Sequence, residues 1–218
     1  MRKALAIDSS DAQLIREYAL ALAAADRKGA AAEFHRWMVS LKDGDSDRLK
    51  VPAAGLALLA GDTTEASNAA ALARARIGEE WAPQWLGELG AWYYMAGDYA
   101  TALELLNDAL QQRPGDPQLS TVRAWVQIQN RTLADALQGL DSVYGSRPVT
   151  PDTTMARAIA QWLAHERVAA MANYSTGSGN QPEWKDPRWV KALYSPVVVE
   201  AVGEMEAEQR RQETASKK

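Results

Sequence analysis

The chain contains no cysteine, and this absence excludes several kinds of site at once. Disulfides, thiolate metal centres and cysteine nucleophiles all require that residue. Histidine is scarce too, since His35 and His165 are the only two among 218 residues. A zinc-binding helix of the two-histidine type would need a second histidine four residues after His165, where Ala169 stands. We therefore expect no metal site, no cofactor and no catalytic set, and we predict that the protein is not an enzyme.

Strong charge and long apolar runs are also missing. Lys and Arg number 24 against 28 Asp and Glu, a net charge of −4, which has the wrong sign for non-specific nucleic-acid binding. No apolar run approaches the roughly 20 residues that span a bilayer. The basic start at Met1–Lys3 is followed by an apolar stretch that stops at Asp8, too short for the core of a signal peptide. We expect a cytoplasmic protein (periplasmic if the chain is an excised fragment) without nucleic-acid partners or direct membrane insertion.

Two other motifs are incomplete. The segment 43–47 begins like a calcium-binding loop, but Arg48 stands where the turn needs glycine and Ala54 where a bidentate glutamate would close the site. The segment 177–179 is rich in glycine but has neither the preceding strand nor the lysine of a phosphate-binding loop. We interpret the first as a solvated loop between helices.

What the chain does contain is a repeat. Pro114 and Pro148 are 34 residues apart, and Gly61-Asp62 recurs 36 residues later as Gly97-Asp98. Alanine, the best helix former, is abundant, and 47% of the residues are apolar. Gly-Asp suits a short turn between two helices, and nothing in these units alternates with the period of a strand. Each unit therefore reads as a pair of helices.

The periodicity predicts an all-α fold. Thr150 is a plausible N-cap with Pro151 in the first turn of its helix. The segment 174–182 is polar and glycine-rich, and we predict a loop there. An aromatic helix then includes Trp184, Trp189 and Tyr194, and the charged end of a last helix frays into solvent. The predicted helices before and after the loop are 10–26, 29–42, 47–60, 63–77, 82–96, 99–112, two in 117–150, one in 151–173, and 196–212.

One unit carries the residues of a known family. It has, in order, Leu89-Gly90, Tyr93, Gly97-Asp98-Tyr99, Ala102, Leu106, Ala109 and Pro114. This pattern resembles the tetratricopeptide repeat (TPR), which has Leu-Gly, Tyr, Gly-x-Tyr, Ala, a large residue, Ala and Pro at these spacings. The next unit departs from it, with Arg131 and Leu133 where Gly and Tyr are usual. The resemblance covers residues 12–173 and implies a right-handed superhelical solenoid of antiparallel helix pairs, because one pair cannot bury its own apolar face.

The resemblance also implies where a partner would bind. In this family the first helix of each pair lines a concave groove that takes a peptide. The family's clamp for acidic tails uses Lys and Asn, but Gly87, Ala91, Thr121 and Trp125 stand at those positions, so we expect an apolar or amphipathic partner. The groove candidates carried over in this way are Gln84, Glu88, Tyr94, Gln118, Val122, Trp125, Ile128 and Gln129.

Two alternatives remain open for the aromatic residues. Trp125, Ile128 and Tyr94 could instead pack against the chain's own C-terminal segment, because the ends of a repeat array need covering. Trp92 stands where the family has a small residue, and we expect it to fill a widened gap between helix pairs.

We therefore predict a repeat domain at 1–173 and an irregular and helical C-terminal extension at 174–218. The predicted function is a non-enzymatic adaptor or scaffold that binds a peptide or helical segment in the TPR groove. The alternative is an assembly module of bacterial envelope machinery, such as secretion, pilus or polysaccharide export. Ala4–Asp8 resembles the end of a second helix, which suggests a fragment of a longer array.

Overall fold

The computed structural model describes residues 12–26, 28–40, 47–144 and 149–215. The segment Ala4–Asp8 and most of the loop 43–47 lie outside these ranges. Contacts divide the chain into two compact units, Met1–Gln112 and Arg113–Lys218. The predicted domain boundary at 173/174 falls within a helix of the second unit.

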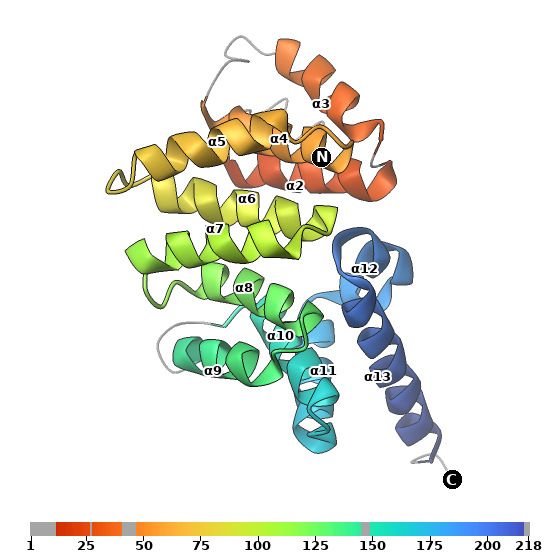
Figure 1. Ribbon diagram of the computed structural model, residues 1–218. Helices are drawn as coiled ribbons and strands as arrows, with labels where there is room; N and C mark the ends of the chain where they lie inside the picture. The colour runs from red at the N-terminus through yellow and green to blue at the C-terminus, as the bar shows by residue number, and fades with distance from the viewer. Residues whose placement is uncertain (1–11, 27, 41–46, 145–148, 216–218) are drawn as a thin grey trace. The chain divides into compact units, whose positions relative to one another are not determined.

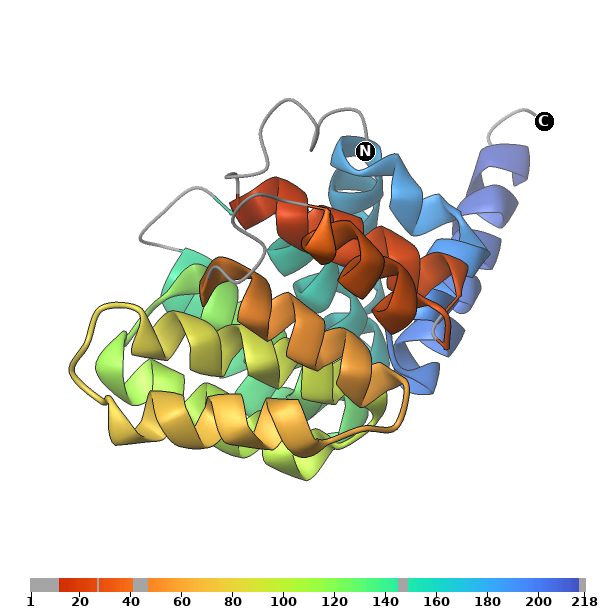
Figure 2. The same ribbon diagram turned by 90° about the horizontal axis from the view of Figure 1, so that it is seen from above.

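The first unit consists of helices stacked in pairs along the sequence (Figures 1 and 2). Short turns join the two helices of each pair, so the helices run antiparallel. Each pair leaves an apolar face that the next pair covers, which is why α6 packs against both α4 and α5. The helices are α2 (Ala12–Ala25), α3 (Ala30–Val39), α4 (Asp47–Leu59), α5 (Thr64–Ala75), α6 (Ala82–Ala96) and α7 (Tyr99–Gln112).

The second unit contains two further pairs and a C-terminal segment (Figure 1). In the part of the chain that the structure describes there is no strand, which confirms the predicted all-α class. The pairs are α8 (Pro117–Gln129) with α9 (Leu133–Tyr144) and α10 (Pro151–Leu163) with α11 (Arg167–Asn180). The C-terminal segment consists of the 3₁₀ helix η1 (Pro182–Lys185), α12 (Pro187–Leu193) and α13 (Pro196–Ala215).

The helix starts follow from local chemistry. The Thr150 side chain accepts a hydrogen bond from the Thr153 amide at 3.1 Å, which confirms the predicted N-cap. Asp116 caps α8 in the same way, with its carboxylate 2.9 Å from the Gln118 amide nitrogen. Proline at the first turn of both helices needs no donor there.

The turns within the pairs share one backbone conformation. Gly61, Gly97, Arg131 and His165 all have positive φ, at 100°, 88°, 61° and 66°. After each of them, the next residue's amide donates to the carbonyl five residues earlier, as in Asp98 to Tyr93 and in Glu166 to Gln161. This is the hydrogen bond of a Schellman motif, and it ends the first helix of each pair. The repeat therefore continues as far as His165, beyond the residues that match the family pattern well.

Two sequence predictions about this last pair are wrong. Residues 151–173 form two helices rather than one, separated by the turn at His165. The predicted loop at 174–182 is helical as far as Asn180. The reason is packing: a Cβ built on Gly177 would lie 2.7 Å from Cγ and Sδ of Met155, so glycine lets α11 approach α10 closely. Tyr174 and Ser178 on the same helix are buried.

Trp92 behaves as predicted. Its side chain is 1% exposed, and a Cβ built on Gly55 would lie within 2.5 Å of three atoms of its ring. The indole therefore occupies space that the glycine of α4 leaves open. Trp92 belongs to the core between α4 and α6.

Candidate functional site

The first-helix face of the first unit remains accessible along α6. Gln84 is exposed, and Glu88, Ala91 and Met95 are half-buried. Tyr94, also predicted to face a partner, is 4% exposed and packs with its ring 5.8 Å from that of Tyr99. This face thus offers an apolar centre with an amide and a carboxylate toward the start of the helix.

Two tryptophans lie at the start of the same helix. The rings of Trp81 and Trp85 are 4.7 Å apart, edge to face, and both side chains are half-buried. The indole nitrogen of Trp81 donates to Glu79 at 2.6 Å. The two rings form a rigid apolar end to the α6 face.

In the second unit the structure separates the predicted groove residues into two groups. Gln118 is exposed at the start of α8, and Val122 and Gln129 further along it are half-buried. Trp125 is 2% exposed and Ile128 is fully buried. The two largest apolar side chains of the predicted site on α8 are therefore not accessible.

The chain's own C-terminal segment covers Trp125. The Trp125 ring lies 5.7 Å from that of Trp184 and 5.1 Å from that of Tyr194. Trp189 completes the cluster, 5.4 Å from Trp184 and 5.6 Å from Tyr194. Of the two alternatives open in the sequence, the structure shows Trp125 packed against the chain's own C-terminal segment, through Trp184 of η1 and Tyr194 after α12.

Asp152 fixes this aromatic cluster to α10. Its carboxylate accepts a hydrogen bond from the Tyr194 hydroxyl at 2.6 Å and another from the Trp125 indole nitrogen at 3.3 Å. Both donors would otherwise be partly buried without a strong acceptor. Sequence reasoning missed Asp152. A carboxylate in the first turn of a helix is common because it interacts favourably with the helix dipole, so its presence does not indicate a tertiary contact.

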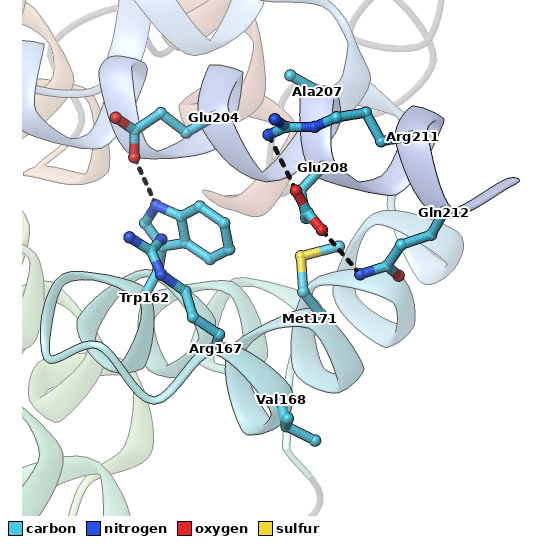
Figure 3. Close-up of a pocket in the computed structure, with 9 residues that line it drawn as sticks. All are labelled: Trp162, Arg167, Val168, Met171, Glu204, Ala207, Glu208, Arg211 and Gln212. Carbon is cyan, nitrogen blue, oxygen red and sulfur yellow. Dashed lines mark hydrogen bonds and ion pairs between the residues drawn. The ribbon is translucent and has the colours of Figure 1, made fainter. Parts of the chain in front are cut away.

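A second feature of this unit is a cleft of about 750 Å³ between α10, α11 and α13 (Figure 3). Trp162, Val168, Met171 and Ala207 supply its apolar surface. The charged lining is Arg167, Glu204, Glu208 and Arg211, with Gln212 at one end. Sequence reasoning singled out none of these residues as a site.

The described residues contain no group of three or more His, Asp or Glu side chains able to hold a metal ion. His165 is exposed in the turn between α10 and α11. Among the helices of the described ranges, none is long and apolar enough to cross a membrane.

Stacked pairs with a shared turn geometry define a helical-repeat protein. The family model of the tetratricopeptide repeat matches residues 93–160, which confirms the predicted resemblance and identifies this region as TPR. Comparison with curated proteins and with solved structures gave no match. Tetratricopeptide repeats generally mediate protein–protein interactions.

Proposed function

We propose that this protein is a non-enzymatic binding scaffold and that its partner segment lies along the first-helix face of α6. The observation that carries the proposal is the contrast between the two units. On α6 the side chains of Gln84, Ala91 and Met95 are accessible, whereas on α8 the aromatic cluster already covers Trp125. A partner therefore finds the open first-helix face in the first unit.

The chemistry of this face selects the partner. Ala91 leaves room for a side chain of the partner, and Met95 adapts its shape to what packs on it. Glu88 disfavours an acidic tail, and no lysine stands among the α6 face residues to hold a carboxylate. The face therefore suits an amphipathic helix or an extended apolar segment.

A random-peptide display library selected against the full chain tests the proposal directly. We expect selected peptides to carry apolar residues at helical or alternating spacing. Ala91→Arg should weaken their binding at least about tenfold, equal to about 1.4 kcal/mol, because the long cation fills the centre of the face. Circular dichroism checks that the variant is folded.

The matched control is Ala100→Arg, the same change at an exposed position of α7, a second helix. Peptides should bind this variant as well as they bind the original chain. Equal binding to the Ala91 and Ala100 variants would exclude the α6 face as the site. Peptides that are uniformly acidic would contradict the proposed partner chemistry.

A further inference from the structure

The helix α13 does not occupy the place of a next repeat. Within the first unit α6 packs against both helices of the preceding pair, and within the second unit α10 packs against both α8 and α9. By the same rule a further first helix would pack on α10 and α11 together. Instead α13 packs mainly on α8 and α10, both first helices, and less closely on α11. The cleft opens between α11 and α13 (Figure 3).

An exposed apolar side chain lies at the edge of this cleft. Val168 is 88% exposed, the most exposed large apolar side chain in the described ranges. It belongs to the same lining as Met171 and Trp162, so a protruding side chain and a hollow of about 750 Å³ share one face. An isolated exposed valine is ordinary, but one at the edge of an apolar hollow marks an interaction site.

The charges around the cleft are balanced. Arg167 stacks over the Trp162 ring at 3.6 Å and makes no ion pair among the described residues. Glu204 accepts a hydrogen bond from the Trp162 indole nitrogen at 2.6 Å, and Glu208 pairs with Arg211 at 2.9 Å. Because this face carries both signs of charge, a two-fold axis can place a cation of one copy opposite an anion of the other. A partner of one charge sign would meet a like charge at either side.

We propose that this cleft is a self-association surface and that its occupant is a second copy of this chain. In a two-fold arrangement Val168 of each copy enters the cleft of the other. The same rotation brings Arg167 of one copy toward the glutamates of its partner. The guanidinium of Arg167 is suited to this role. It stacks on Trp162 through its face, so the N–H donors at its edge can still bind a carboxylate. This surface shares no residue with the proposed peptide-binding face of α6.

Sedimentation of the full chain over a concentration series, up to about 100 µM, tests this inference. We expect a monomer–dimer equilibrium that Val168→Glu weakens at least about tenfold. The variant should fold, because glutamate is favourable in the first turn of a helix. Circular dichroism verifies this. Val39→Glu is the matched control, since Val39 is 73% exposed on α3 and should leave the equilibrium unchanged.

Three results would overturn the inference. The original chain could remain a monomer throughout the series, which includes the case of a cleft that takes a different protein. The Val168 variant could dimerise as well as the original chain. The Val39 variant could lose dimerisation equally, which would assign the effect to added charge alone. None of these outcomes affects the proposed function, which is tested separately by comparing peptide binding to the original chain with peptide binding to Ala91→Arg.

Discussion

The hydroxyl of Tyr194 donates to Asp152 across 2.6 Å and joins two segments that are 42 residues apart. Asp152 stands in the first turn of α10, and Tyr194 follows α12. The indole of Trp125 is a second donor to the same carboxylate, so Asp152 of α10 links α8 with the C-terminal segment. This arrangement makes the C-terminal segment part of the folded second unit, and its Trp184 is 0% exposed.

Tyr194→Phe should destabilise the protein by about 1.5 kcal/mol. The change removes a hydrogen bond to Asp152 that is shorter than the one from Trp125, while it keeps the ring contacts with Trp125 and Trp184. Urea unfolding followed by tryptophan fluorescence measures the loss of unfolding free energy. Tyr174→Phe is the control, because the Tyr174 hydroxyl is buried without a hydrogen-bond partner among the described residues. That variant should be neutral or more stable, and a loss in both variants would show that the cause is not the bond to Asp152.

The burial of Tyr174 also predicts a pH effect. Burial, with a smaller contribution from the negative charge of Glu206, raises the pKa of Tyr174 to about 12 from its usual value of 10. Between these values the folded protein holds a proton that the unfolded chain loses. The contribution of Tyr174 to stability is thus complete below about pH 10 and declines as pH rises toward about 12, by roughly 2 kcal/mol.

The measurement is the free energy of unfolding as a function of alkaline pH for the original chain and for Tyr174→Phe. Other tyrosines and lysines titrate in the same range, so the difference between the two curves isolates Tyr174. The two curves should run parallel below about pH 10 and diverge above it, where the original chain loses stability relative to Tyr174→Phe. Parallel curves throughout would mean that Tyr174 ionises as it does in water.

The sequence was sufficient for the helix pairs from α2 to α9 and for the role of Trp92, because apolar periodicity and Gly-Asp turns are local signals. It was insufficient at 174–182, because glycine predicts a loop by its own preference. Gly177 is helical since its missing side chain admits Met155, and that contact depends on the crossing of two helices. The cleft beside Val168 depends on where α13 packs, which no local pattern encodes.

Substitutions at the two glycines of α11 should distinguish the effect of close helix packing from that of helix propensity. Gly177→Ala should cost about 1 kcal/mol, because the added Cβ would lie 2.7 Å from the buried Met155 side chain and force it to shift. Gly179→Ala should be neutral or slightly stabilising, since a Cβ added there would meet no atom within 4 Å and alanine is the better helix former. Thermal unfolding of both variants checks the difference. Equal stabilisation by both would show that α10 and α11 are not closely packed at Gly177.

The two histidines of the chain should respond to glycine in opposite directions. His165 holds φ at 66° in the turn between α10 and α11, where Gly61 and Gly97 stand in earlier pairs. Glycine adopts this conformation without strain, so His165→Gly should stabilise the protein by about 0.5 kcal/mol after the added entropy of the unfolded chain is counted. His35 is exposed within the helix α3, where glycine should cost about 0.5 kcal/mol. Urea unfolding of the two variants gives the sign of each change, and destabilisation by His165→Gly would mean that the histidine side chain itself supports the turn.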